Sequence, residues 1–297
     1  MRIQKECFNN MKSSMSLKKI LQIEWVNYLA TNMIPRLQIT AFVGWLSKIQ
    51  SPFLTKLLIF IWSRFTDLDF SDSEKQAFGS LNECFIRKLK PGARTISVRQ
   101  RVILSPCDGI IGAYGDVSNG KALQIKGSAY SIKALFDDSD FAEKCSKFKY
   151  LTLRLTSSMY HRFHSPSDST IEYVKVVPGE IFNVNPITLK RKDNLFCKNE
   201  RVVIQLRTHD TSEEIILVAV GAILVGSVRL HCIDRTIKST NRKCYQFWPN
   251  KMVSRGEELG WFEHGSTILV FLNNSCEFER TITLNKILRM GNELANY

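Results

Sequence analysis

The sequence predicts an α+β fold in which a helical N-terminal part precedes a larger β-rich domain. Between Ile20 and Phe65, apolar stretches are interrupted by single charges and by Pro35 and Pro52, a pattern typical of short helices with proline at or near their starts. From Val102 onward, short apolar runs alternate with Gly, Asp, Asn and Pro, which is typical of strands joined by turns. A hydrophobic content of 44% is ample for a packed core.

These patterns divide the chain into three parts. Residues 1–19 are polar and basic without periodicity and are expected to form a loose leader, residues 20–66 a helical segment, and residues 67–297 the β-rich domain. Residues 66–100 are expected to contain one helix between loops, ending at Pro91-Gly92. The strands expected after it are Val102–Leu104, Ile110–Tyr114, Leu151–Leu155, Ile171–Val177, Val202–Leu206, Ile215–Val225, Ser227–Leu230 and Ile268–Leu272.

Basic residues are concentrated near the N-terminus. The formal net charge is +13, and residues 1–64 hold nine Lys or Arg residues against two acids, Glu6 and Glu24. Such a surplus suits either nucleic acid or an anionic membrane surface. The basic residues are dispersed among large aliphatic residues with no glycine-aromatic recognition motif, so no nucleic-acid partner is expected.

The helical segment has the composition of a membrane-surface element. Its longest uncharged run, Leu37–Ser47, is shorter than the about 20 apolar residues that a spanning helix needs. Trp45 and Trp62 suit headgroup depth, and the segment carries lysine and arginine for anionic lipid. From the residues alone, a helical subdomain packed on the core is equally well supported, because a helix that packs on a core and a helix that lies on a membrane show the same apolar stripe. The apolar stripe comprises Phe53, Leu54, Leu57, Leu58, Ile61 and Phe65, and the nearby cations are Lys48, Lys56 and Arg64.

The eight cysteines are scattered without a Cys-x-x-Cys pair, which argues against a zinc ribbon or a disulfide framework and favours reduced thiols in a cytosol-facing protein. No secretory signal is recognised, because the first apolar run comes late, carries Glu24 and lacks a small-residue cleavage site.

His161 and His164 are spaced like half of a metal site, but no Cys or carboxylate of suitable spacing accompanies them, so no metal is expected.

Three turns of the β-rich domain carry reactive side chains. Asp108 lies in a Pro- and Gly-bounded turn, His161 and His164 lie within four residues of one another, and Ser266 follows Gly265 directly. Asp, His and Ser are the ingredients of nucleophile activation, although their order in the chain proves nothing. The Gly-x-Ser-x-Gly elbow of many serine hydrolases is absent. A serine after a glycine near the C-terminus can instead attack the carbonyl of its own preceding residue.

Several motifs in one order make the chain resemble phosphatidylserine decarboxylases of the bacterial and mitochondrial type. The resemblance covers nearly all of residues 35–272, and the motifs that carry it run from Ser105 to Thr267. They are Ser105-Pro106-Cys107-Asp108-Gly109; Lys126-Gly127 with Tyr130-Ser131 and Leu135; Tyr160-His161-Arg162-Phe163-His164-Ser165-Pro166; Pro178-Gly179-Glu180 with Val184-Asn185; Leu195-Phe196 with Asn199-Glu200-Arg201; Val220-Gly221-Ala222 with Val225-Gly226; and Arg255-Gly256-Glu257-Glu258-Leu259-Gly260 leading to Gly265-Ser266-Thr267.

The resemblance implies a self-cleaving proenzyme. Ser266, deprotonated by His164 with Asp108 behind it, would attack the Gly265 carbonyl, leaving a β chain of residues 1–265 and an α chain of residues 266–297. Ser266 would become an N-terminal pyruvoyl group, the enzyme's covalent cofactor. Its ketone would form a Schiff base with the amine of phosphatidylserine and accept the electrons left by departing carbon dioxide, giving phosphatidylethanolamine. His161 is the candidate acid that protonates the carbanion.

The same resemblance implies a peripheral protein on the cytoplasmic face of the cell membrane, because an anionic lipid substrate favours the membrane interpretation of residues 35–65. A homodimer is common in this family. Two departures are His264, where relatives tend to have an aliphatic or aromatic residue, and Ser169, where a glycine commonly follows the histidine loop.

Three other functions remain as alternatives. A pyruvoyl decarboxylase of a soluble amino acid would not need the apolar basic segment. A non-catalytic membrane-surface binding protein would keep the chain intact. A simple serine hydrolase would react with fluorophosphonates at an internal serine.

Overall fold

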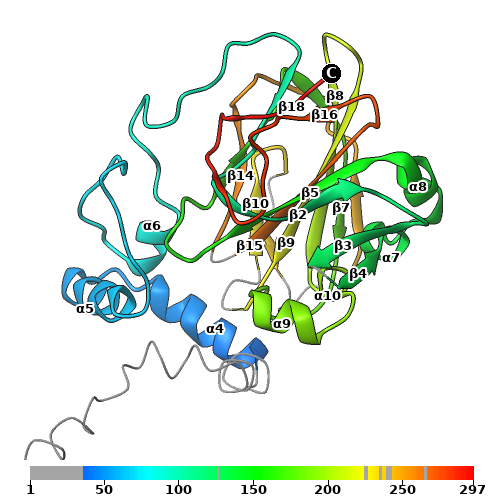
Figure 1. Ribbon diagram of the computed structural model, residues 1–297. Coiled ribbons are helices and arrows are strands. Elements are labelled where there is room, and N and C mark those ends of the chain that lie inside the picture. Colours follow the sequence, from blue (N-terminus) through cyan, green and yellow to red (C-terminus); the bar gives the residue numbers. More distant parts are fainter. Residues whose placement is uncertain (1–35, 126, 224–226, 234–235, 239–242, 264–265) are drawn as a thin grey trace, which may run out of the picture.

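The computed structural model describes residues 36–125, 127–223, 227–233, 236–238, 243–263 and 266–297 (Figure 1). The predicted leader, residues 1–19, and the first part of the predicted helical segment, residues 20–35, lie outside this range. Within it, helices come first and a β-rich domain follows, as the α+β prediction requires. No helix in the part of the chain that the structure describes is long and apolar enough to cross a bilayer.

Two helices form the described part of the N-terminal segment: α4 (Arg36–Ser47) and α5 (Pro52–Ser63). Helix α5 begins where the sequence predicts, because Ser51 caps it and Pro52 occupies its first turn without losing a hydrogen bond. The buried Thr55 donates from its hydroxyl to the Gly79 carbonyl, 3.0 Å away, and so attaches α5 to the domain. Both helices lie at one end of the main sheet (Figure 1).

The helix expected in residues 66–100 ends earlier than predicted. Only α6 (Leu81–Phe85) forms, and the chain through Pro91-Gly92 is turn and loop. Ser80 caps its start, accepting from the amide of Glu83 at 3.1 Å. Beyond its end, the Arg87 guanidinium donates to the Ser158 carbonyl at 2.8 Å, so tertiary contacts hold this stretch where the sequence pattern predicts that the helix continues.

A nine-stranded antiparallel sheet forms the centre of the domain, in the order β12-β7-β8-β9-β15-β5-β2-β17 with β13 also paired to β7. Strand β15 (Ser266–Leu272) lies between β5 and β9, and all of its residues are buried. The other strands are β2 (Gly109–Asp116), β5 (Lys149–Leu155), β7 (Ser169–Val177), β8 (Arg201–Thr208), β9 (Glu214–Gly221), β12 (Tyr245–Phe247), β13 (Lys251–Val253) and β17 (Ile287–Leu288).

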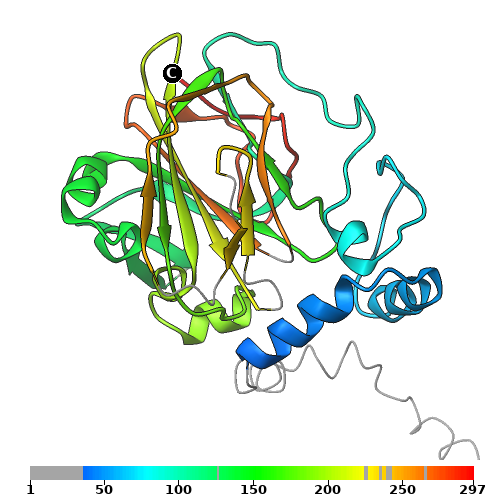
Figure 2. The same cartoon turned by 180° about the vertical axis from the view of Figure 1, so that it is seen from behind.

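Alternation along β15 divides the interior into two cores. Ile268 and Val270 face a core shared with smaller sheets, whereas Leu269 and Phe271 face a core covered by short helices and a hairpin (Figures 1 and 2). The smaller sheets have the orders β11-β10-β14-β6 and β1-β18-β16. Their strands are β1 (Val102–Leu104), β6 (Arg162–His164), β10 (Ser227–Leu230), β11 (Thr236–Lys238), β14 (Glu258–Phe262), β16 (Glu277–Phe278) and β18 (Glu293–Asn296).

The cover of the second core consists of the hairpin β3 (Lys121–Ile125) and β4 (Ser128–Ser131) with short helices. These helices are α7 (Ile132–Phe136), α8 (Ser139–Lys144), the 3-10 turn η1 (Cys145–Lys147), α9 (Pro186–Arg191) and α10 (Leu195–Lys198). Most predicted strands are confirmed within a few residues. The predicted Ile215–Val225 is too long, because β9 ends at Gly221. All cysteines from Cys84 onward are free thiols.

Candidate active site

A cavity of about 580 Å³ lies between the N-terminal helices and the end of the main sheet. Its helix side is apolar, with Leu46 from α4, Trp62 from α5 and Phe85 from α6. Its sheet side is more polar and includes Arg154 and Ser266. The cavity therefore joins an apolar wall to a polar end, as an amphiphilic ligand requires.

Ser266 occupies the polar end of this cavity and is completely buried. It is the first residue of β15 and lies opposite Leu155 of β5 and Gly221 of β9. Its hydroxyl finds no hydrogen-bond partner among the residues that the structure describes. Leaving such a group unsatisfied costs roughly 1–3 kcal/mol, which calls for a functional explanation. Gly265 and His264, the residues just before it, lie outside the described range.

His161 is buried close to the wall of the same cavity. Its ring centroid is 3.9 Å from that of Phe85, whose side chain lines the cavity. Its Nδ1 lies 2.8 Å from the Met159 carbonyl oxygen, which can only accept, so Nδ1 carries the hydrogen. His161 therefore packs against the end of helix α6, which contributes Phe85 to the cavity wall.

His164 is held from both sides of its ring. Nδ1 lies 2.9 Å from the Gly256 carbonyl oxygen and must donate to it, so Nε2 of the neutral ring accepts from the Tyr160 hydroxyl at 2.9 Å. Burial is the main cause that lowers the pKa of His164. The hydrogen bond to the Gly256 carbonyl and the nearby acids Glu258 and Asp108 oppose this effect only in part. The ring is therefore kept neutral, with its lone pair on Nε2, as a general base requires.

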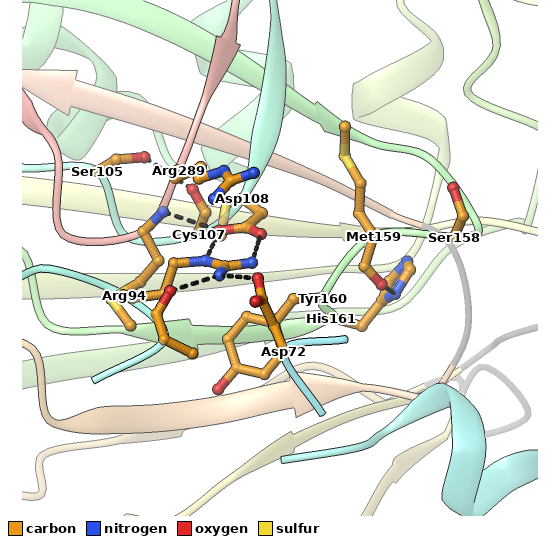
Figure 3. A network of polar contacts seen from close by, with 12 residues as sticks. Asp72, Arg94, Ser105, Cys107, Asp108, Ser158, Met159, Tyr160, His161 and Arg289 are labelled. Carbon is orange, nitrogen blue, oxygen red and sulfur yellow. Dashed lines mark hydrogen bonds and ion pairs between the residues drawn. The ribbon is translucent and has the colours of Figure 1, made fainter. Parts of the chain in front are cut away.

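Asp108 is bound by an arginine rather than by a histidine (Figure 3). Arg94 donates to its two carboxylate oxygens at 3.0 and 2.5 Å, and the amide of Met290 donates to Oδ1 at 2.9 Å. Arg94 also reaches Asp72 at 2.7 Å. Throughout the described ranges, Asp108 makes no hydrogen bond to His164, and His164 makes none to Ser266. The predicted chain of contacts from Asp108 through His164 to Ser266 is therefore not formed in this conformation. The charge of Asp108 still acts on the His164 ring.

Sequence reasoning missed the partners that hold these groups. Tyr160 was part of the histidine motif but had no assigned role, and Arg94 lies in a loop after Pro91-Gly92 with no motif around it. Arg154 also lacked a signal, because a single arginine inside a strand looks like an ordinary solvent-facing residue. The only clue was its position near the end of the predicted strand Leu151–Leu155, and the pairing of that strand with β15 is visible only in the structure.

The departure at Ser169 has a structural use. Ser169 begins β7, is buried, and its hydroxyl lies 2.6 Å from that of Ser167 in the loop that follows His164.

Within the described chain, no cluster of three or more His, Cys, Asp or Glu residues is arranged to hold a metal ion.

The fold and the cavity define an enzyme-like site with a buried hydroxyl, two buried histidines and an apolar entrance. Comparison with known proteins agrees with this class. The family model for phosphatidylserine decarboxylase matches residues 81–296, most of the β-rich domain. The chain belongs to the phosphatidylserine decarboxylase family, a family of carboxy-lyases.

Bacterial relatives match over nearly their full length. The phosphatidylserine decarboxylase proenzyme of Legionella pneumophila strain Corby is 32% identical over 89% of this chain and 95% of its own. That of Brevibacillus brevis is 33% identical over 90% of this chain and 97% of its own. That of Vibrio cholerae is 33% identical over 89% of this chain and 95% of its own.

Proposed function

We propose that this chain is a phosphatidylserine decarboxylase proenzyme that cleaves itself between Gly265 and Ser266 and then converts phosphatidylserine to phosphatidylethanolamine and carbon dioxide. The observation that carries the proposal is Ser266, a buried hydroxyl without a partner in the described structure, at the end of a cavity open to apolar helices. Family membership supports the reaction, and the relatives' description as proenzymes supports the self-cleavage.

Cleavage is an acyl shift followed by an elimination. The Ser266 hydroxyl loses its proton, Oγ bonds to the Gly265 carbonyl carbon, and the peptide C–N bond breaks while its nitrogen gains a proton, so an ester replaces the amide. The Cα proton of Ser266 then leaves and the Cβ–O bond breaks, which releases Gly265 as a carboxylate. The resulting dehydroalanine tautomerises and takes up water, releasing ammonia and leaving the pyruvoyl group on residue 266.

His164 is the proposed base for this shift. Its neutral ring is suited to accept a proton at Nε2, the atom that now accepts from Tyr160. Because Nε2 does not contact Ser266, a local change that frees it from the Tyr160 hydroxyl must precede the attack. Asp108, bound by Arg94, supplies negative charge that stabilises the protonated ring once it forms.

The buried Ser266 at the cavity's polar end fits the pyruvoyl group, which supplies a ketone that reacts with the substrate amine and accepts the electron pair left by carbon dioxide. His161 then supplies the proton that replaces the carboxylate. Because the Met159 carbonyl holds its Nδ1 hydrogen, donation from Nε2 requires the doubly protonated ring. The apolar helices form one wall of the site.

The helices also explain how a bilayer lipid reaches the cavity. Phe53 is 80% exposed, and other large side chains of α4 and α5 are exposed with it while Trp62 lines the cavity. An exposed apolar surface with Lys56 and Arg64 close by in the sequence suits a peripheral protein that binds the anionic cytoplasmic face of a membrane. The other exposed apolar residues here are Phe42, Trp45, Leu57, Phe60, Ile61 and Phe65. A homodimer remains a prediction.

The intact mass of the purified, denatured protein tests the proposal. We expect two chains, residues 1–265 and 266–297, with a pyruvoyl N-terminus on the second that gains hydrogen on borohydride reduction. Wild-type protein should then release carbon dioxide from phosphatidylserine vesicles. A single 34.1 kDa chain, even after incubation with lipid, would contradict self-cleavage and favour a binding protein. Release of carbon dioxide from a free amino acid instead of the lipid would favour the soluble-substrate enzyme.

A further inference from the structure

Arg154 is the only charged side chain among the described residues that line the cavity. It lies on β5 immediately before Leu155, the residue opposite Ser266 in the pairing of β5 with β15. Burial lowers the pKa of its guanidinium, and no acid contributes to this pKa. An arginine stays protonated even so, and the cavity therefore contains a permanent positive charge close to the reacting residue.

Among the described residues, the other arginines with buried side chains (Arg87, Arg94, Arg162 and Arg201) are all bound by protein groups. Arg201 donates to four backbone carbonyls, Arg94 binds Asp108 and Asp72, and Arg162 binds Glu258 and the Ile86 carbonyl. In the described structure, Arg154 has neither a hydrogen bond nor an ion pair. Since a partly buried cation without a partner costs stability, it indicates a ligand that completes the site.

Among the described residues, the cation that directly follows the cavity lining in the chain is already paired. Lys48 follows Ser47, which lines the cavity, but its ammonium group lies 3.0 Å from Glu263 Oε2 and is neutralised there. Arg154 is therefore the described cation at this cavity that is left to bind a ligand anion.

We propose that Arg154 binds the phosphodiester group of the lipid substrate; this inference rests on the proposed function. The amine of the lipid must reach residue 266, its acyl chains fit the apolar helix side, and its phosphate lies between the two, near Arg154. The substrate carboxylate is the less suitable partner, because an ion pair with it would stabilise the charge that decarboxylation must remove. The phosphate is unchanged by the reaction, so binding it holds substrate and product alike.

Binding to an uncleaved chain tests the contact without any chemistry. In the Ser266→Ala background, calorimetry would compare dihexanoyl phosphatidylserine, dihexanoyl phosphatidylethanolamine and dihexanoylglycerol, which lacks phosphate. Arg154→Gln should weaken binding of both phospholipids by about tenfold or more, the scale of a hydrogen bond to a charged group, and leave binding of the glyceride unchanged. Arg280→Gln, at an exposed site outside the cavity, is the matched control and should change none of them.

Three results would overturn the proposal. Weaker binding of the serine lipid alone would assign Arg154 to the carboxylate, and unchanged binding of both phospholipids would remove it from the site. Inorganic phosphate that competes as well as the lipids do would show a general anion site. Arg154→Gln should melt no lower than its parent, because it removes a cation without a partner, so misfolding is excluded by the same samples. Failure of self-cleavage in the wild type would refute the proposed function yet leave this binding result interpretable.

Discussion

Helix α5 and strand β15 are both rich in large apolar residues, yet the structure uses them in opposite ways. Every residue of β15 is buried between β5 and β9, whereas Phe53 and Phe60 of α5 are largely exposed. Hydrophobicity alone therefore does not say what a segment packs against. The buried strand places Ser266 in the cavity, and the exposed helix supplies the apolar wall and a surface for lipid. Substitutions in each region should affect different steps.

The largest effect is expected at the start of β15. Ser266→Ala should abolish both cleavage and decarboxylation, because no hydroxyl remains to attack Gly265. The variant should melt at the same temperature as uncleaved protein or higher, since it removes a buried hydroxyl without a described partner. Intact mass and thermal unfolding check both outcomes. A cleaved Ser266→Ala chain would show that another residue is the nucleophile.

The two histidines should separate cleavage from turnover. His161→Ala should cleave normally yet lower kcat by about 10²–10⁴-fold, the usual contribution of a general acid. His164→Ala should remain uncleaved because it lacks the base. Intact mass and carbon dioxide release from the same preparations would show the split. Full turnover in cleaved His161→Ala would remove that residue from the role of acid.

A smaller effect is expected on the exposed helix. Phe53→Ser should weaken binding to anionic vesicles by about tenfold, because inserting one aromatic side chain contributes about 1.5–3 kcal/mol. Cleavage and melting temperature should not change. Met252→Ser, at a site 74% exposed in the β-rich domain, is the control. Vesicle sedimentation measures both, and equal losses in the two variants would mean that α5 has no special contact with lipid.

The smallest expected effect is a pH dependence of stability from His164. Burial lowers the pKa of His164 in the folded protein below its ordinary value of 6.5. Below about pH 6.5 the unfolded chain therefore binds a proton at His164 more readily than the folded protein does. The contribution of His164 to the free energy of unfolding is therefore complete above that value and is lost as the pH falls through the folded pKa. Urea unfolding of Ser266→Ala and of Ser266→Ala with His164→Gln should diverge between about pH 7.5 and about pH 5.5. Parallel curves would contradict the lowered pKa.

Local pattern explains why much of the fold was predictable. Strands such as Val102–Leu104 and Ser227–Leu230 were predicted with their observed bounds, because apolar runs between turn residues depend on neighbours in the sequence. The predicted end of a helix at Pro91-Gly92 was wrong, because contacts such as that of Arg87 with Ser158 override local preference beyond Phe85. Hairpin β3–β4 was missed for a similar reason, since its stability depends on a core formed by distant segments.

The sequence by itself determined the chemical groups of this protein: the Gly-Ser-Thr before an apolar run, the two spaced histidines, the aspartate turn and the apolar basic segment. These are local and can be recognised without coordinates. Tertiary structure alone decided their surroundings. It placed Arg94 on Asp108 and Tyr160 on His164. The pairing of β5 with β15 also brought the unpaired Arg154 into the same cavity as Ser266, although the two residues are more than a hundred positions apart in the chain. Such contacts depend on register and burial, which no single stretch of sequence contains.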